Sequence, residues 1–285
     1  MQLVVLSGVS GSGKSLALKS LEDAGYFCVD NLPAELIEPL ADYALKRGEA
    51  RVAIGADARA RESLGHLPEI VARARERGAD VRVIFLDATD ESLMRRFGET
   101  RRPHPLAEEG RSIAQSIAEE RRLLAWLAEF GQRVDTSGLT PPQLRSCIRD
   151  LVETDASRLT LSFQSFGFKE GVPLDADFVF DARFLANPHY DPRLRAQTGR
   201  DEEVVEFLER ETEARQFVDD IEQFLKRWLA KFGREHRASI NVAIGCTGGC
   251  HRSVYVAESL ARKFNADYPV IVRHRDLENE VEGGR

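Results

Sequence analysis

Short apolar runs alternate with amphipathic stretches through the first half of the chain. Continuous apolar runs of this length are typical of strands buried on both faces of a parallel sheet, and helical spacing of apolar residues predicts the segments between them. The predicted strands are Leu3–Ser7, Tyr26–Val29, Arg51–Ala56, Val81–Leu86 and Arg133–Asp135. The predicted helices are Lys14–Ala24, Ala34–Lys46, Glu62–Arg77, a polar helical region from Glu91 to about Phe130, and Pro141–Glu153. This alternation favours crossover connections and a parallel sheet.

The pattern changes around residues 154–158. Arg158–Phe168 alternates apolar and polar side chains, which predicts a half-buried strand. Asp181–Gly199 is rich in Asn, Pro, Asp and Gly, and we expect an ordered loop whose side chains could form a site. The remaining predicted elements are two helices within Glu202–Phe232, a strand at Ile240–Ile244, a helix at Ser253–Phe264 and a strand at Val270–Arg273. We therefore expect two α/β domains, residues 1–154 and 158–285.

Composition narrows the class of protein. The formal net charge of −7 means that any contact with nucleic acid has to come from a local basic patch. Four scattered cysteines are too few for a disulfide framework in 285 residues, which indicates a reducing compartment. The first apolar run is too short for a signal peptide or a membrane span, so we expect a cytoplasmic protein without a membrane partner.

The first predicted strand leads into a Walker A loop, Gly8-Val9-Ser10-Gly11-Ser12-Gly13-Lys14-Ser15. The loop lies between a strand and a helix, the context in which this pattern binds phosphate. Glycines let the backbone turn its N–H groups inward around an anion, and the helix N-terminus adds a favourable dipole. Lys14 would reach the β- and γ-phosphates, and the Ser15 hydroxyl would bind Mg²⁺. The sequence therefore predicts a kinase-like P-loop NTPase domain that binds ATP or GTP with Mg²⁺.

In P-loop proteins, a carboxylate at the end of a buried strand typically lies near the Mg²⁺ ion, in addition to the serine of the Walker loop. Asp87 follows the apolar run Val81–Leu86 and is the candidate. Asp30 and Asp57 also follow predicted strands and compete for this role. Each of the three is equally suited to cap a helix or a turn.

A basic cluster follows the fourth predicted strand. It consists of Arg95, Arg96, Arg101, Arg102 and then His104. In a P-loop protein such a cluster could close over the phosphates as a lid. The alternative is a solvated basic helix face.

A second glycine-rich turn lies late in the chain, in Cys246-Thr247-Gly248-Gly249-Cys250-His251-Arg252-Ser253. It too follows a strand and opens a helix, which is an anion-binding geometry, and Arg252 adds a bidentate donor. The spacing Cys-x₅-Arg-Ser also matches phosphatases that use a cysteine nucleophile, here Cys246. Binding without catalysis, a zinc site of Cys246, Cys250 and His251, and a tight turn around a buried thiol are the alternatives.

Several segments in this order resemble the RapZ/YvcJ family of bacterial P-loop proteins, some of which act as RNase adapters. They are the Walker loop, Gly25–Pro33, Ser165–Lys169, Asp181–Asp191 and Gly245–Ser253, and together they span nearly the whole chain. The resemblance implies weak ATPase or GTPase activity at most, with Lys14 and Asp87 as candidates for hydrolysis. It also implies a homo-oligomer.

The resemblance further assigns ligands to particular residues. A short GTP-associated stretch corresponds to Asp57, Ala58, Arg59 and Ala60, where Ala60 departs from the usual asparagine. The C-terminal domain would sense glucosamine-6-phosphate, an amino-sugar phosphate. By motif, its pocket would comprise Asp181, His189, Cys246, Thr247, Gly248, Gly249, His251, Arg252 and Ser253.

RNA is the last partner that the resemblance implies, as a small regulatory RNA presented to an endoribonuclease. Family members that bind RNA end in a basic tail, whereas residues 276–285 here are mostly acidic and would repel phosphates. The basic residues that remain nearby are Arg262, Lys263, Arg273, His274 and Arg275. Besides a nucleotide-dependent regulator, the sequence leaves open a small-molecule kinase, a phosphatase using Cys246 and a pure RNA-binding module.

Overall fold

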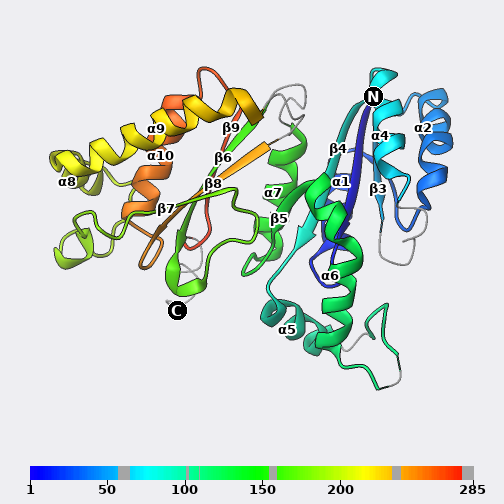
Figure 1. Ribbon diagram of the computed structural model, residues 1–285, viewed down its shortest axis with the longest axis horizontal. Coiled ribbons are helices and arrows are strands. Elements are labelled where there is room, and N and C mark those ends of the chain that lie inside the picture. Colours follow the sequence, from blue (N-terminus) through cyan, green and yellow to red (C-terminus); the bar gives the residue numbers. More distant parts are fainter. Residues whose placement is uncertain (57–64, 101–102, 109, 154–158, 233–238, 278–285) are drawn as a thin grey trace. The chain divides into compact units, whose positions relative to one another are not determined.

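The computed structural model describes the chain except residues 57–64, 101–102, 109, 154–158, 233–238 and 278–285. The chain divides into two compact units, Met1–Ala156 and Ser157–Arg285. Each unit is built around its own parallel sheet, so the expected α/β class is confirmed (Figure 1).

The N-terminal sheet has five parallel strands in the order β2-β3-β1-β4-β5. Their bounds are β1 Gln2–Gly8, β2 Phe27–Val29, β3 Arg51–Gly55, β4 Asp80–Asp87 and β5 Gln132–Asp135. The helices are α1 Lys14–Asp23, α2 Ile37–Lys46, α4 Leu67–Glu76, α5 Asp90–Thr100, α6 Ile113–Phe130 and α7 Pro141–Glu153, with a 3₁₀ turn η1 at Ala34–Leu36. Helices α2 and α4 lie on one face and α1 and α7 on the other (Figure 1). Because β1 is central, its apolar run is buried on both faces, as the sequence predicted.

The polar helical region expected from Glu91 to about Phe130 is two helices, α5 and α6. Pro103 and Pro105 lie between them, and proline lacks the N–H that a helix interior needs. Helix α6 then starts afresh with a capping box. The Ser112 Oγ accepts from the Gln115 N–H at 3.2 Å, and the Gln115 Oε1 accepts from the Ser112 N–H at 2.9 Å.

The C-terminal sheet has four parallel strands in the order β7-β8-β6-β9. Their bounds are β6 Thr160–Gly167, β7 Phe178–Asp181, β8 Ser239–Cys246 and β9 Val270–His274. The helices are α8 Glu202–Arg210, α9 Thr212–Phe232 and α10 Arg252–Phe264, with 3₁₀ turns η3 at Phe168–Glu170 and η4 at Pro188–Tyr190. The two helices expected between residues 202 and 232 are confirmed.

Strand β6 corrects the expectation of a half-buried strand, because all eight of its residues are buried. It lies between β8 and β9, so its polar side chains are enclosed by neighbouring strands. The Gln164 Oε1, for example, accepts a hydrogen bond from the Asn241 amide of β8 at 3.2 Å. The sequence also did not predict β7, which pairs with the edge of β8 immediately before the expected loop. Within the described part of the chain, no helix is long and apolar enough to cross a membrane.

Candidate functional site

The Walker loop joins the carboxyl end of β1 to the amino end of α1. Gly13 is the residue before α1 and has φ +101°, a conformation that side chains rarely adopt. A Cβ there would lie 2.6 Å from the Leu144 Cδ2 of α7. The Val9 N–H donates to the Leu86 carbonyl of β4 at 3.1 Å, which anchors the loop to the sheet. This is the strand, turn and helix N-terminus that phosphate binding requires.

The two polar side chains expected at the phosphates lie at the start of α1. The Lys14 Nζ lies 3.4 Å from the Ala56 carbonyl oxygen, just beyond the carboxyl end of β3. Ser15 is exposed, as a residue that binds a solvated Mg²⁺ would have to be. The arrangement places a cation and a hydroxyl beside the loop.

Two residues outside the motif hold the loop from α6 and from the α5–α6 connection. The Glu120 Oε2 accepts from the Ser10 N–H and the Glu120 Oε1 from the Ser10 hydroxyl, both at 2.7 Å. The His104 Nε2 lies 3.2 Å from the Glu120 Oε2, and both side chains are fully enclosed. Sequence reasoning missed Glu120 because it appears as one charge among many on a polar helix.

The arginine cluster contacts the loop mainly through Arg96. Its guanidinium donates to the Gly11 carbonyl at 3.0 Å and to the Thr136 carbonyl at 2.7 Å. Burial, followed by the nearby charge of Arg95, lowers the pKa of Arg96. The Thr136 hydroxyl donates in turn towards the Ser12 carbonyl at 2.9 Å. Arg96 therefore contacts the backbone of the Walker loop through its hydrogen bond to Gly11.

The other residues of the expected lid do not lie together at the loop. Arg95 is exposed on α5, and His104 is buried against Glu120. Arg101 and Arg102 lie outside the described residues. The GTP-associated stretch Asp57, Ala58, Arg59 and Ala60 also lies outside them.

Asp87 ends β4 as predicted, but its carboxylate is already engaged. The Arg133 guanidinium lies 2.6 Å from Oδ2 and that of Arg121 lies 3.2 Å from Oδ1. The Ala88 N–H also donates to Oδ1 at 2.8 Å. In this structure the Asp87 carboxylate is thus paired with two arginines, and its contact with Mg²⁺ stays a prediction. The competing Asp30 is exposed and accepts from the Asn31 N–H at 2.9 Å.

The second loop joins the carboxyl end of β8 to the amino end of α10. Cys246 lies buried at its base, where its sulfur accepts from the Gly249 N–H at 3.2 Å and lies 3.1 Å from the Ser253 Oγ. Gly249 has φ +81°, and a Cβ there would lie 2.7 Å from the Gly167 nitrogen of β6. The turn is therefore packed closely on the end of the neighbouring strand, while Thr247 is exposed.

Arg252 joins this loop to the segment that begins at Asp181. Its guanidinium donates to the Arg183 carbonyl at 2.6 Å, to the Leu185 carbonyl at 3.1 Å and to the Thr247 Oγ1 at 3.3 Å. Hydrogen bonds from the Arg183 side chain, helped by its backbone N–H, lower the pKa of Asp181 although burial acts against this. The 181–185 segment and the glycine-rich turn thus lie side by side.

The two histidines of the expected pocket also approach each other. The ring centroids of His189 and His251 are 6.3 Å apart. His189 is exposed, whereas His251 is buried with its Nε2 3.2 Å from the Leu194 carbonyl oxygen. Among the described residues, no three Cys, His, Asp or Glu side chains are grouped as metal ligands. The zinc alternative at Cys246, Cys250 and His251 therefore finds no support.

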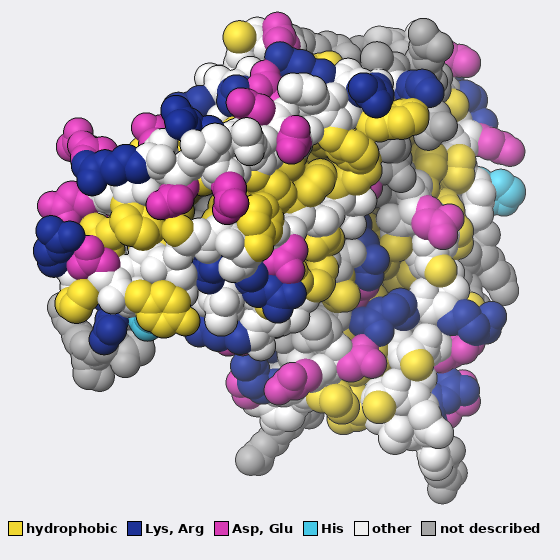
Figure 2. Space-filling model, turned by 60° about the vertical axis from the view of Figure 1, so that its left-hand side comes forward, with side chains coloured by type: hydrophobic (Ala, Val, Ile, Leu, Met, Phe, Trp, Pro, Cys, Tyr) yellow, Lys and Arg dark blue, Asp and Glu magenta, His cyan; other side chains and the backbone are white. Residues whose placement is uncertain are grey.

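The basic residues considered for RNA do not share one surface. Lys263 is paired with Asp219 at 3.0 Å and Glu222 at 2.6 Å. Arg275 is buried and donates to the Gly167 and Gly171 carbonyls at 3.0 and 2.8 Å. Arg262 and Lys263 lie near the carboxyl end of α10. Arg273 lies in β9 and Arg275 follows it, both at the opposite edge of the sheet. Figure 2 shows Lys and Arg side chains interspersed with Asp and Glu side chains on the face it displays.

Known protein families match both halves of the chain, and each half contains one of the two loops. A family model of the RapZ-like N-terminal domain matches residues 1–156, and one of the RapZ C-terminal domain matches residues 159–278. The chain belongs to the RapZ-like protein family. This RapZ-like chain is 54% identical to a nucleotide-binding protein of Thiobacillus denitrificans, over 97% of this chain and 100% of that protein. It is 51% identical to one of Chromobacterium violaceum, over 98% of this chain and 100% of that protein.

Solved structures resemble the RapZ-like chain more distantly. One is a shikimate kinase from Bacteroides thetaiotaomicron, with 17% identity, a TM-score of 0.36 and coverage of 52% of this chain and 95% of that chain. Another is a gluconokinase from Sinorhizobium meliloti, with 17% identity, a TM-score of 0.34 and coverage of 53% and 94%.

Proposed function

We propose that this RapZ-like protein is a two-domain cytoplasmic regulator. Its N-terminal unit binds ATP or GTP with Mg²⁺ at Gly8–Ser15, and its C-terminal unit binds an amino-sugar phosphate at Cys246–Ser253. The observation that carries the proposal is the shared geometry of the two loops. Each is a glycine-rich turn between the carboxyl end of a parallel strand and the amino end of a helix.

The relatives support the first half of this proposal. The proteins from Thiobacillus and Chromobacterium are both called nucleotide-binding proteins, and they align with 97% and 98% of this chain.

The surroundings of the second loop support an amino-sugar phosphate as its ligand. The turn offers backbone N–H groups and the N-terminus of a 13-residue helix to a phosphate. Asp181 and His189, on the segment tied down by Arg252, would supply partners for the amino and hydroxyl groups. The exposed side chains of Thr247 and His189 leave the ligand a route of access.

Hydrolysis in this proposal is slow and serves to switch states. The engagement of Asp87 by Arg121 and Arg133 leaves Mg²⁺ with Ser15 and the phosphates as its first partners. A small RNA and an endoribonuclease, which the family resemblance implies as partners, stay predictions. Of the basic residues considered for RNA, Lys263 is paired with acidic side chains and Arg275 is buried.

Thermal-shift measurements on the full chain test the proposal, because a ligand that binds the folded state raises its melting temperature. ATP or GTP with Mg²⁺ and glucosamine-6-phosphate are each expected to raise it. Lys14→Ala should remove the triphosphate shift and keep the sugar shift, and His189→Ala should do the reverse. No shift with either ligand class on folded protein would refute the proposal.

A phosphatase using Cys246 is the second candidate, favoured by the contacts of its sulfur. The Gly249 N–H donates to this sulfur at 3.2 Å, and the Ser253 hydroxyl lies 3.1 Å from it. Arg252, however, is turned towards backbone carbonyls. If this candidate is right, p-nitrophenyl phosphate is hydrolysed and Cys246→Ser abolishes the turnover. Equal background rates in both proteins would exclude it.

A further inference from the structure

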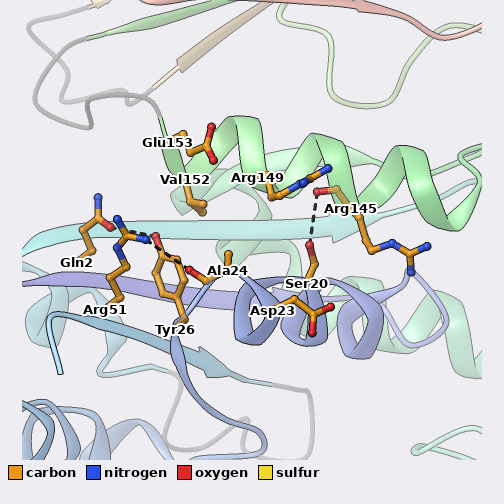
Figure 3. Close-up of a pocket in the computed structure, with 10 residues that line it drawn as sticks. All are labelled: Gln2, Ser20, Asp23, Ala24, Tyr26, Arg51, Arg145, Arg149, Val152 and Glu153. Atoms are coloured by element: carbon orange, nitrogen blue, oxygen red, sulfur yellow. Dashed lines mark hydrogen bonds between the residues drawn. The ribbon is translucent and has the colours of Figure 1, made fainter.

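A cavity of about 540 Å³ lies at the amino edge of the N-terminal sheet (Figure 3). Gln2 and Arg51, the first residues of β1 and β3, line it together with the end of α1 and the middle of α7. The Gln2 end of the cavity lies about 20 Å from the Walker loop, at the other end of β1. The Arg145 end is nearer to the loop, because the neighbouring Leu144 packs next to Gly13. None of the residues that line the cavity belongs to Gly8–Ser15, so the cavity and the proposed nucleotide site have different linings.

Three guanidinium groups line this cavity. Arg145 and Arg149 lie one turn apart on α7, on the same helix face (Figure 3). Within the described ranges, neither guanidinium makes a hydrogen bond or an ion pair with another residue. Arg51 donates to the Ala24 carbonyl at 3.4 Å, and its guanidinium lies 5.9 Å from the centre of the Tyr26 ring. Two like charges one helical turn apart repel each other unless an anion joins them.

The rest of the lining is acidic and aromatic. Asp23 of α1 and Glu153 of α7 face the same cavity, so the ligand meets hydrogen-bond acceptors as well as arginines. Tyr26 contributes its ring, and its hydroxyl donates to the Gln2 Oε1 at 3.1 Å. A fitting ligand therefore carries an oxyanion together with hydroxyl or amino donors.

We propose that this cavity is a second small-molecule site that binds a phosphate ester rich in hydroxyl or amino groups. The phosphate lies between Arg145 and Arg149, whose forked donors match its oxygens. The carboxylates of Asp23 and Glu153 accept from the donor groups, and the remainder lies against Tyr26. The shared chemistry fits a nucleoside monophosphate or a sugar phosphate, and the site does not depend on nucleotide binding at the Walker loop.

Protection of individual arginines from chemical modification shows where a ligand binds. Binding at the two loops does not affect the readout at Arg145 and Arg149. The full chain is treated with phenylglyoxal, with and without saturating AMP or glucose-6-phosphate, and labelling is read at each arginine by mass spectrometry. One of the two compounds is expected to protect Arg145 and Arg149 roughly tenfold or more. The compound that protects identifies the source of the phosphate. Arg47, an exposed residue that follows α2 and does not line the cavity, should be labelled equally in all samples.

Calorimetry on a variant adds an independent measurement. In the Lys14→Ala, His189→Ala background, the protecting compound should still bind. Adding Arg145→Gln and Arg149→Gln should weaken its binding roughly tenfold or more, whereas Lys46→Gln and Lys226→Gln, which remove the same charge away from the cavity, should not. Unchanged labelling of Arg145 and Arg149 with both compounds would overturn the proposal. Equal binding by the two charge variants would overturn it as well.

Discussion

Glu120 accepts two hydrogen bonds from Ser10, one on each carboxylate oxygen and both at 2.7 Å. The two residues are 110 positions apart in the sequence. Helix α6 thus contacts the Walker loop through Glu120. The His104 ring also lies next to the Glu120 carboxylate. The contact between Glu120 and Ser10 leads to the first prediction.

Glu120→Ala should loosen the Walker loop. It leaves the Ser10 N–H and hydroxyl without their acceptor in a water-poor site, which typically costs about 1–3 kcal/mol. We expect a lower free energy of unfolding of the N-terminal unit in urea and weaker triphosphate binding by calorimetry. Glu120→Gln keeps one acceptor oxygen and should retain most of both. Equal stability of the alanine variant and the parent protein would show that the contact contributes nothing.

Gly13→Ala should abolish triphosphate binding, because the new Cβ meets Leu144 and the backbone has φ +101°. Gly25→Ala is the matched control, since Gly25 has φ +83° at the other end of α1 but nothing within 4 Å of its added Cβ. Both variants carry the cost of a left-handed alanine, about 1–2 kcal/mol. Only the first should lose the calorimetric signal with ATP and Mg²⁺. If both variants lose the calorimetric signal, general destabilisation of the fold explains the result and the prediction is wrong.

Arg252→Ala should detach the 181–185 segment from the second loop. The Arg183 and Leu185 carbonyls lose a charged donor, and hydrogen bonds of this kind are worth about 1.5–3 kcal/mol each. We expect a lower unfolding midpoint for the C-terminal unit and no thermal shift with glucosamine-6-phosphate. Arg193→Ala removes a side chain that is 83% exposed and should change neither quantity. The prediction fails if the two variants behave alike.

Glu258 should make the stability of the C-terminal unit depend on acidity. Burial acts to raise its pKa, but hydrogen bonds from His274 at 3.0 Å and Arg200 at 2.8 Å lower it below the ordinary value of 4.5. A lowered folded-state pKa stabilises the fold above the unfolded-state pKa, and this contribution disappears as pH falls through the folded-state pKa. The stability difference between the parent and Glu258→Gln should therefore be largest near neutral pH and shrink below pH 4.5. Urea unfolding across this range measures it, and a pH-independent difference would contradict it.

The sequence by itself determined the local elements and the two loops. Short apolar runs mark buried parallel strands such as β1 and β4 because burial on both faces favours apolar side chains at successive positions. A glycine-rich turn between a strand and a helix marks an anion site because only backbone geometry is needed to make it. Both features lie within a few consecutive residues, so the order of residues is enough to reveal them.

Only the tertiary structure determined which residues form hydrogen bonds and ion pairs with the site residues. Glu120 at Ser10, Arg133 at Asp87 and the cavity between α1 and α7 each join segments far apart in the chain. The complete burial of β6 follows from its place between two strands that come much later in the sequence. Periodicity shows which face of an element is apolar, but it does not show which other element covers that face. The partner of each charged side chain is therefore fixed by packing, and packing brings together residues that the sequence keeps apart.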